Sequence, residues 1–401
     1  MNAFLSKEAI YTLWHEKLLQ LAPRLAGENG SHQKLIEGDL KLDLGLDSLE
    51  IFELAAYFHS VFHLMSGPLS QYLLQYQRVE EWLEVIEEGA NDWTRPMTFF
   101  TSGSTGNPKP FVHQKKYLIQ EMEAWNTILK PQGFFWRAVS PLHIYGFLFT
   151  VFLPSHIGIG VMDMRKVHTH QVFSLVKPRD WIIGFPLLYR QWIHSDVRIP
   201  LGLKLLSSTS PLPLEVASQM HAYGLEVTEI YGSTETAGIG YRAHPENSFH
   251  LLPYWQRKED QLVRYHPTQG ASAPFALMDK CKWETNHRFT ILGRRDHAVQ
   301  IGGINVFPNQ VAEQMRGIEG VANCWVKKMK PSEGERLKCW VLLADPKASA
   351  SSLKKICYQW IEEHLSAEAR PRHVIVSDHP PLDEMGKVKD WSIYHSAPFL
   401  A

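Results

Sequence analysis

The segment that decides the fold of this chain reads FFTSGSTGNPK and runs from Phe99 to Lys109. Its two bulky apolar residues end an expected strand, and the small residues after them expose backbone N–H groups and hydroxyls. Glycine lets a backbone approach phosphate oxygens closely, and Lys109 adds a mobile cation. The segment therefore predicts a phosphate-binding loop, with a Gly/Ser-rich surface turn as the plain alternative. It is not a Walker A loop, because the pattern G-x-x-x-x-G-K-[ST] is absent.

The order T-S-G-S-T-G-x-P-K resembles the phosphate-binding loop of the adenylate-forming superfamily. That superfamily includes acyl- and aryl-CoA synthetases, adenylation domains of peptide synthetases, and luciferases. The resemblance implies that the loop holds the β- and γ-phosphates of ATP. The residues expected to bind ATP there are Thr101, Ser102, Gly103, Ser104, Thr105, Gly106 and Lys109.

A second motif, VTEIYGSTETAG, spans residues 227–238. A strand is expected to end at Tyr231, whose ring would stack on adenine, with Gly232 beside it. Glu235 supplies a hard carboxylate oxygen suited to Mg²⁺ that bridges phosphates. A turn followed by a capped helix is the alternative interpretation. The resemblance implies that Thr234 donates to the α-phosphate and that Glu235 is the magnesium ligand, so both are candidate catalytic residues.

Four more candidate nucleotide contacts follow other expected strands. Ser208 and Thr209 stand in a turn where the family has Gly and Ala packed against adenine. Asp279 precedes the G-R-x-D pattern that contains Arg294 by the family's spacing. The resemblance implies that Asp279 and Arg294 hold the ribose hydroxyls.

The C-terminal part resembles the family's mobile lid, with its hinge at Asp296. Its pattern predicts a hairpin around glycines, followed by helix, strand, strand, helix and strand. The resemblance places Gly303 at the pantetheine tunnel. It also implies that Lys387, in PPLDEMGKV, inserts between the carboxylate and the α-phosphate as a catalytic lysine. His143, in SPLHIYGF, is implied to line the acid pocket and is a further catalytic candidate.

The first ninety residues predict a small helical bundle. Apolar residues recur at helical spacing over residues 5–21, a second helix opens at Asp47-Ser48, and further pieces cover residues 69–74 and 79–86. This region holds 14 acidic and 6 basic residues. The segment LGLDSL resembles the attachment site of acyl carrier proteins, which implies a 4'-phosphopantetheine arm on Ser48. The alternative is that Asp47 and Ser48 merely cap a helix.

The whole-chain composition is that of an ordinary globular protein. Of its 401 residues, 44% are hydrophobic and 21% are charged, and the formal net charge of −1 indicates no nucleic acid partner. The start has no signal-peptide pattern, and the four cysteines lack metal-ligand spacing. The most apolar run, residues 145–162, is interrupted by Pro154 and reads as a buried helix and strand. We therefore expect a cytoplasmic protein without a membrane span.

The fold class that the resemblance implies is α/β, with a large αβ adenylation core and a small mobile α+β lid. We expect a four-helix carrier bundle at residues 1–88, the core at 97–294 and the lid at 295–401, with residues 87–92 as a linker. Only about ninety residues precede the phosphate loop, so the chain is similar to compact aryl-acid-activating ligases. Tyr145, Phe147 and Tyr241 near the pocket favour an aromatic acid over a fatty acid.

The expected reaction is a two-step ligation that uses ATP and Mg²⁺. A small carboxylic acid becomes an acyl-adenylate, and a thiol then forms a thioester. The preferred thiol is the arm on Ser48, which would make a phosphopantetheinyl transferase and a downstream condensing enzyme partners. Two alternatives stay open: a ligase that uses free CoA, and a carrier scaffold whose adenylation fold is inactive.

Overall fold

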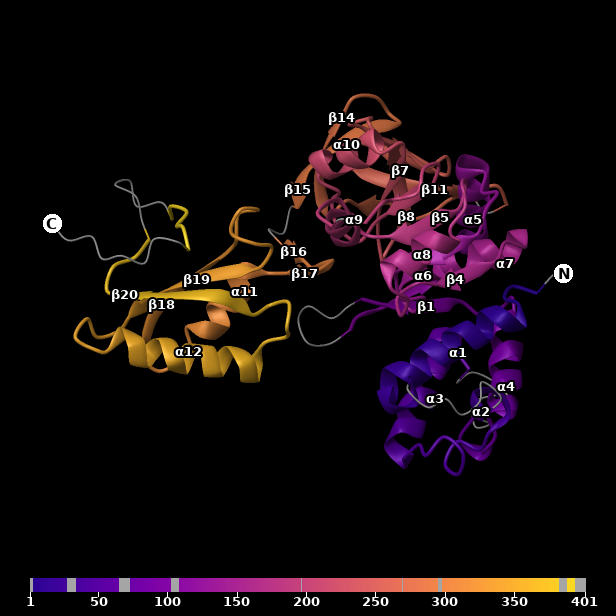
Figure 1. Cartoon of the computed structure of the whole chain (residues 1–401), viewed down its shortest axis with the longest axis horizontal. Coiled ribbons are helices and arrows are strands. Elements are labelled where there is room, and N and C mark those ends of the chain that lie inside the picture. The colour runs from indigo at the N-terminus through magenta and orange to yellow at the C-terminus, as the bar shows by residue number, and fades with distance from the viewer. Residues whose placement is uncertain are drawn as a thin grey trace. The chain divides into compact units, whose positions relative to one another are not determined.

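The computed structural model describes residues 3–26, 34–64, 73–101, 108–195, 197–268, 270–294, 298–381 and 388–393 (Figure 1). The side chains of Lys34 and Arg294 lie outside this part of the chain. The described residues form two compact units. The first contains the N-terminal helices and a large α/β region, up to residue 101 and over 109–277 and 282–290; the second contains residues 278–281 and those from 291 onward. The expected three-domain division stays a prediction.

The N-terminal region is helical, as its apolar spacing predicts. Its elements are α1 (Lys7–Leu21), η1 (Pro23–Ala26), α2 (Lys34–Glu37), α3 (Ser48–Phe62), η3 (Leu73–Gln75) and α4 (Val79–Asn91). Helix α3 begins at Ser48 because the Asp47 side chain accepts hydrogen bonds from Leu49 N and Glu50 N, which forms a capping box with Glu50. Most of the expected piece at residues 69–74 lies outside the described residues.

The predicted linker at residues 87–92 is wrong, because α4 continues to Asn91. A Cβ on Gly89 would lie 1.9 Å from Leu64 Cδ2, so the glycine permits close packing instead of breaking the helix. Asn91 then bonds to both backbone groups of Leu5, with Leu5 N to Asn91 Oδ1 at 2.9 Å and Asn91 Nδ2 to Leu5 O at 3.2 Å. Tertiary packing therefore overrides the loop-like composition.

The first unit is built around a sheet in which the described strands follow the order β14-β15-β9-β8-β7-β6-β5-β3-β4; residues 279–281 of β14 and 291–294 of β15 belong to the second unit. Strands β4, β3, β5, β6 and β7 are mutually parallel, and β8 and β9 extend the sheet antiparallel. The bounds are β3 (Phe135–Arg137), β4 (Val161–Asp163), β5 (Trp181–Gly184), β6 (Lys204–Ser207), β7 (Glu226–Ser233), β8 (Ala237–Ala243), β9 (Phe249–Leu251), β14 (Asp279–Trp283) and β15 (Arg288–Arg294).

Helices cover both faces of the parallel strands, which is why β5 and β6 are apolar and buried. The helices are α5 (Lys115–Leu129), α6 (Ile144–Phe147), η4 (Leu148–Phe152), α7 (Leu153–Ile157), α8 (Thr169–Leu175), α9 (Pro186–Ile193) and α10 (Leu214–Ala222). Helices α8, α9 and α10 share one hydrophobic core with β3, β5, β6 and β7. The apolar run at residues 145–162 is helical and buried up to Pro154, as predicted, but the strand that follows, β4, is half-buried or exposed, so the expected buried strand is wrong.

Two smaller sheets complete the first unit. Strands β1 (Met97–Phe100) and β2 (Pro110–His113) form an antiparallel hairpin around the predicted phosphate loop. The other contains β10 (Trp255–Lys258), β11 (Gln261–His266), β12 (Gly270–Ala271) and β13 (Phe275–Ala276). No helix among the described residues is long and apolar enough to cross a membrane.

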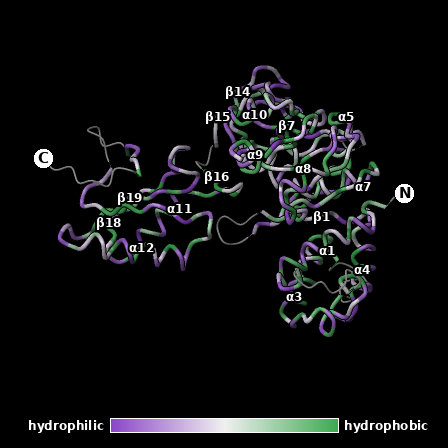
Figure 2. Tube along the Cα trace, viewed as in Figure 1, coloured by the Kyte–Doolittle hydropathy of each residue, from purple (hydrophilic) through white to green (hydrophobic). Residues whose placement is uncertain are grey.

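The second unit has the element order that the lid pattern predicts. Its elements are β16 (Val299–Ile301), β17 (Ile304–Val306), α11 (Pro308–Met315), β18 (Val321–Lys328), β19 (Leu337–Leu343), α12 (Ala350–His364) and β20 (Pro371–Ser377). Strand β19 pairs antiparallel with β18 and parallel with β20. Figure 2 shows hydrophobic segments along β18 and β19, which line this unit's core. Gly302 and Gly303 have φ of 58° and 82°, as a tight hairpin between β16 and β17 requires.

Candidate active site

Most of the predicted site residues of the first unit lie at one edge of the sheet. The SPLH segment follows β3, Ser208 and Thr209 follow β6, and the GSTE motif ends β7. These strands are parallel and in register, so their carboxyl ends meet at the same edge. Open α/β sheets bind ligands at that edge. The fold therefore brings together segments that are nearly one hundred residues apart in the sequence.

The turn between β7 and β8 carries Thr234 and Glu235, and its geometry is tightly constrained. A Cβ on Gly232 would lie 2.2 Å from Ala237 O, so this turn requires glycine. The chain continues into β8, so the alternative of a capped helix after the motif is wrong. Thr234 is half-buried and Glu235 is exposed, which leaves the carboxylate accessible to a ligand.

Side chains from other elements hold the backbone at the end of this turn. Gly238 N donates to Glu121 Oε1 at 2.8 Å. Gly238 O accepts from Tyr254 OH at 3.2 Å and from Trp255 Nε1 at 2.7 Å. A Cβ on Gly238 would lie 2.5 Å from Glu121 Oε1, so glycine is needed for the close approach. Sequence reasoning missed these three side chains, which hold the backbone beside the predicted Thr234–Glu235 turn.

Glu121 is a fully buried carboxyl on α5. Burial raises its pKa, although Arg264 and the hydrogen bonds from Trp125 and Gly238 oppose that shift. Arg264 Nη1 lies 3.9 Å from Glu121 Oε2, and its guanidinium lies 4.1 Å from the centre of the Tyr254 ring. The end of the β7–β8 turn is thus hydrogen-bonded to the buried carboxyl of Glu121, and Arg264 lies beside that carboxyl.

The phosphate-loop hairpin is bonded directly to the β7–β8 turn. His113, buried on β2, has its Nε2 2.7 Å from Thr234 O. A carbonyl only accepts, so Nε2 carries the proton, and burial lowers the pKa of this imidazole. The contact joins the two strongest sequence motifs across 121 positions of the chain. A histidine after the loop was a signal that sequence reasoning could have used.

The base of the phosphate loop is closed by two hydrogen bonds. Thr101 N donates to Lys109 O, and Lys109 N donates to Thr101 Oγ1, both at 3.0 Å. The Lys109 side chain is exposed. Five predicted ATP contacts, Ser102, Gly103, Ser104, Thr105 and Gly106, lie outside the described residues.

The turn after β6 departs from the conformation that most residues prefer. Thr209 is exposed and has a φ of 76°, in the region that favours glycine and strains a β-branched residue. Its neighbour Ser208 donates through Oγ to Ile230 O at 3.2 Å, which links this turn to β7. Strain at a ligand-facing edge is typical of functional turns.

Tyr231 stands on β7 with its ring among other aromatic rings. The ring centre lies 5.8 Å from that of Phe249 and 5.7 Å from that of Phe289. These contacts leave the residue half-buried, so part of it stays accessible to a stacking base.

The donor set at the β7–β8 turn fits Mg²⁺. Thr234 supplies a hydroxyl and Glu235 supplies a carboxylate. Within the described ranges, no group of three or more His, Cys, Asp or Glu side chains forms a metal site made by protein alone. Mg²⁺ commonly binds one or two carboxylates and completes its shell with water and substrate phosphates. Glu235 is therefore the residue that would hold the ion.

The remaining predicted contacts belong to the second unit. Asp279 opens β14 and is half-buried, and Arg294 ends the neighbouring strand β15. Gly303 lies in the β16–β17 hairpin. Lys387 and the hinge residue Asp296 lie outside the described residues.

The three aromatic residues that favoured an aromatic acid, Tyr145, Phe147 and Tyr241, differ in how deeply they are buried. Tyr145 is buried, and its hydroxyl donates to Gly184 O at 3.0 Å and Leu206 O at 2.8 Å, which is a structural role. Phe147 is fully buried beside Phe99. Tyr241 is half-buried.

His143 is the N-cap residue of α6; its side chain makes no capping hydrogen bond and is exposed. Of the segment's aromatic and imidazole side chains, this is the one that stays accessible to an acid.

The geometry defines an α/β enzyme with a phosphate-loop hairpin joined to a carboxylate-bearing turn, and comparison with known proteins agrees. A family model described as AMP-binding enzyme matches residues 64–290, more than half of the chain. The chain therefore belongs to the AMP-binding enzyme family.

Among curated proteins, the chain is 33% identical to a 4-coumarate--CoA ligase of Halorhodospira halophila, over 88% of this chain and 90% of that protein. It is 32% identical to a 4-coumarate--CoA ligase of Rhodobacter capsulatus, over 94% of this chain and 99% of that protein. A solved structure of o-succinylbenzoate CoA synthetase from Bacillus subtilis shares the fold with a TM-score of 0.57, at 19% identity over 73% of this chain and 67% of that chain.

Proposed function

We propose that this protein is an AMP-forming ligase that joins an aromatic carboxylic acid to the thiol of CoA. The observation that carries the proposal is the His113–Thr234 hydrogen bond, which joins the phosphate-loop hairpin to the turn that bears Glu235. Family membership and two relatives named 4-coumarate--CoA ligase support it. The aromatic preference now rests on these relatives, because Tyr145 and Phe147 are core residues.

In the first step, a carboxylate oxygen of the acid attacks the α-phosphorus of ATP, and pyrophosphate leaves. The loop from Thr101 to Lys109 binds the departing phosphates, Thr234 donates to the α-phosphate, and Lys387 neutralises charge on the α-phosphate and carboxylate. Bound at Glu235, Mg²⁺ would supply positive charge against the phosphate oxygens. Asp279 and Arg294 hold the ribose, while Tyr231, Gly232, Ser208 and Thr209 surround the adenine.

In the second step, the thiol sulfur attacks the carbonyl carbon of the acyl-adenylate. The C–O bond to AMP breaks, a thioester forms, and the thiol proton passes to solvent. Rotation of the C-terminal region about Asp296 removes Lys387 and presents the Gly303 face to the pantetheine chain. His143 lines the acid pocket in both steps.

Free CoA is the better-supported acceptor because the N-terminal helices are bonded to the α/β region. The ring centres of Phe4 and Phe152 lie 4.6 Å apart, and His63 Nε2 lies 2.8 Å from Thr98 Oγ1. The alignment with the Rhodobacter capsulatus relative leaves only 6% of this chain unmatched, so it includes most of these helices. Both facts favour the interpretation that the N-terminal helices are a fixed part of a CoA ligase and not a mobile carrier domain.

Self-loading on Ser48 is a second candidate, and a specific observation favours it. Ser48 is exposed at the first position of α3, at the positive end of the helix dipole, which favours a phosphate. Leu42, Leu49 and Phe52 around it are also exposed, at 88%, 65% and 58%. In that case a 4'-phosphopantetheine arm on Ser48 accepts the acyl group, and a phosphopantetheinyl transferase and a condensing enzyme become partners in the cytoplasm.

The test begins with ATP–pyrophosphate exchange over 4-coumarate, benzoate, acetate and octanoate. We expect the fastest exchange with an aromatic acid, and CoA should then give an acyl-CoA and AMP at equal rates in wild type and Ser48→Ala. Absence of exchange with every acid would contradict the ligase proposal and favour an inactive scaffold. An acyl mass gain on phosphopantetheinylated wild type, absent from Ser48→Ala, would establish the second candidate instead.

A further inference from the structure

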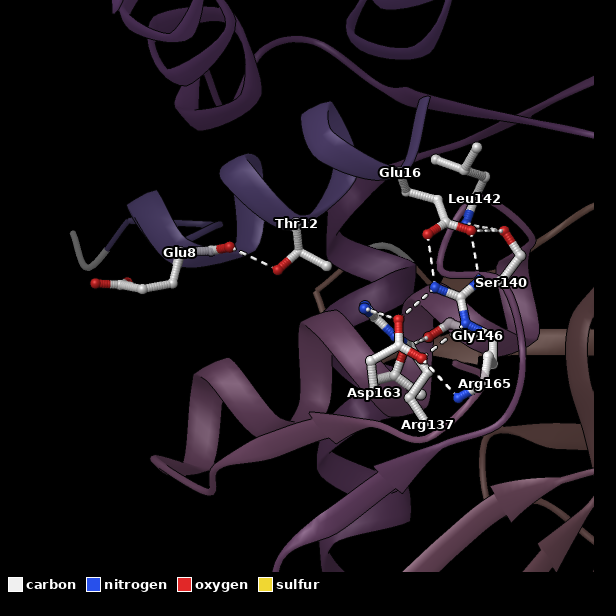
Figure 3. Close-up of polar contacts among 10 residues, drawn as sticks. Glu8, Thr12, Glu16, Arg137, Ser140, Leu142, Gly146, Asp163 and Arg165 are labelled. Atoms are coloured by element: carbon white, nitrogen blue, oxygen red, sulfur yellow. Dashed lines mark hydrogen bonds and ion pairs between the residues drawn. The ribbon is translucent and has the colours of Figure 1, made fainter. Parts of the chain in front are cut away.

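An ion-pair network joins the first helix of the chain to the edge of the parallel sheet (Figure 3). Arg165 Nη1 donates to Glu16 Oε1 at 2.6 Å, and Arg165 Nη2 donates to Glu16 Oε2 at 2.7 Å. Two parallel N–H···O bonds of this kind fix orientation as well as distance. Glu16 lies on α1, and Arg165 follows β4, so the pair spans 149 positions of the chain.

The network continues to the carboxyl ends of two strands. Arg165 Nε donates to Asp163 Oδ1 at 2.9 Å, and Arg137 Nη2 donates to Asp163 Oδ2 at 2.8 Å. Asp163 ends β4 and Arg137 ends β3. Two carboxylates and two guanidiniums alternate, so the charges balance although the side chains are only 11–30% exposed. Removing one member of such a set leaves an opposite charge without its partner.

Glu16 also contacts the segment that precedes His143. Ser140 Oγ donates to Glu16 Oε1 at 3.1 Å, and Leu142 N donates to Ser140 Oγ at 3.3 Å. Desolvation opposes ionisation of Glu16, but hydrogen bonds from Arg165 and Ser140 outweigh it and lower the pKa of this carboxyl. The carboxylate therefore orients a serine that in turn holds the backbone next to His143.

Apolar contacts from the same helices reach this segment. Leu13 of α1 and Tyr57 of α3 line, with Pro141 and Leu142, a cavity of about 10 Å³. The N-terminal helices and the segment that precedes His143 therefore lie next to each other around this cavity. A Cβ on Gly146 would lie 1.9 Å from Ser140 O, so α6 approaches the backbone of this segment as closely as only glycine allows.

We propose that Glu16 is a positioning residue for acid binding: through Ser140 and Leu142, the first helix sets the place of His143 at the acid pocket. This inference rests on the proposed ligase function. In this proposal the N-terminal helices help to position residues of the active site, because the network connects them to the ends of β3 and β4. A displacement of about 1 Å at such a position is enough to weaken substrate binding or catalysis.

The test compares Glu16→Gln with Glu8→Gln in the full chain. Both changes remove one carboxylate from α1, but Glu8 is exposed in the first turn. The readout is the Michaelis constant for the acid and for ATP in pyrophosphate exchange, with the fastest of the four acids named above. We expect Glu16→Gln to raise KM for the acid about tenfold and KM for ATP less than twofold, and Glu8→Gln to change neither.

Ser140→Ala provides a milder variant that keeps the ion pair. It removes only the hydrogen bond to Glu16 and the one that Leu142 donates, so it should raise KM for the acid in the same direction and leave Tm nearly unchanged. Unchanged acid KM in both variants, or equal changes for acid and ATP, would overturn the positioning role. If wild type itself exchanges with no acid, the ligase proposal fails first, and this inference fails with it.

Discussion

Glu121 illustrates how one buried side chain supports the turn that bears Glu235. Its Oε1 accepts from Gly238 N and from Trp125 Nε1, the latter at 3.2 Å. Both donors would be left unpaired in the interior if the carboxyl were removed, and Arg264 would lose its carboxylate partner while keeping its hydrogen bond to Gln120 Oε1. A buried unpaired donor costs more than the net value of a hydrogen bond.

We predict that Glu121→Met lowers the free energy of unfolding by about 3 kcal/mol, because it breaks a buried pair. It should also raise the Mg²⁺ concentration that gives half-maximal pyrophosphate exchange, since the turn bearing Glu235 loses its support. Glu121→Gln keeps one acceptor oxygen and should change both the free energy of unfolding and the Mg²⁺ requirement less than Glu121→Met does. Urea denaturation and a Mg²⁺ titration measure the two effects; an unchanged Mg²⁺ requirement in Glu121→Met would contradict the role.

Thr209 supplies a second prediction at the residue scale. A left-handed φ costs a non-glycine residue about 1–2 kcal/mol, part of which glycine gives back through its larger unfolded-state entropy. Thr209→Gly should therefore increase the free energy of unfolding by about 0.5–1 kcal/mol in urea. Ser208→Gly is the matched control and should destabilise the protein, because the Ser208 hydroxyl bonds to Ile230 O. Destabilisation by Thr209→Gly would show that φ strain is absent.

At the scale of elements, the end of α4 meets the start of α5 around one buried lysine. Lys115 is 2% exposed, and its Nζ donates to Asp92 O at 2.6 Å and lies 5.2 Å from the centre of the Phe4 ring. Desolvation lowers the pKa of this ammonium to about 8. The start of a helix is also an unfavourable place for a cation. This junction therefore carries a charge that folding disfavours.

The pH dependence of this junction follows from the sign of the shift. Between about pH 8 and pH 10.4, the unfolded chain holds the Lys115 proton more tightly than the folded chain, so stability rises with pH. We predict that Lys115 contributes a rise of about 1–2 kcal/mol in the free energy of unfolding between pH 8 and pH 9.5. Lys115→Met should abolish that part of the rise, whereas Lys116→Met should keep it. Equal pH slopes in wild type and Lys115→Met would refute this.

At the scale of the whole molecule, the N-terminal helices share one compact unit with the α/β region. Buried aromatic contacts and the Glu16–Arg165 pair join them. We expect helices and a sheet that are joined in this way to open together. The helices are therefore expected to contribute to the stability of the sheet, in contrast to a tethered module that unfolds by itself.

We predict that amides of α1 and α3 and amides of β5 and β6 lose hydrogen-exchange protection at the same urea concentration, because they open together. Hydrogen exchange read by mass spectrometry resolves the two regions in one experiment. The Glu16→Gln variant should lower both midpoints together. Loss of protection in α1 and α3 well before the strands would contradict the single unit and favour a separable carrier.

The sequence by itself determined the family, the element order of the second unit and the start of α3, because local patterns carry these features. The glycine-rich loop, the GSTE motif, the Gly302-Gly303 turn and the Asp47 cap depend on residues close together in the chain. The helical continuation of α4 through residues 87–91 was missed, because Gly89 looks like a breaker until Leu64 packs on it.

Only the tertiary structure decided which side chains support the candidate site. His113, Glu121 and Glu16 act across 121, 117 and 124 positions of the chain, and no local pattern marks Glu121 or Glu16. Only the tertiary structure also shows the role of Tyr145, whose hydroxyl bonds to the carbonyl oxygens of Gly184 and Leu206 on two strands. Motifs follow from the chemistry that each segment needs, whereas positioning contacts depend on which buried polar groups the fold brings within hydrogen-bond distance.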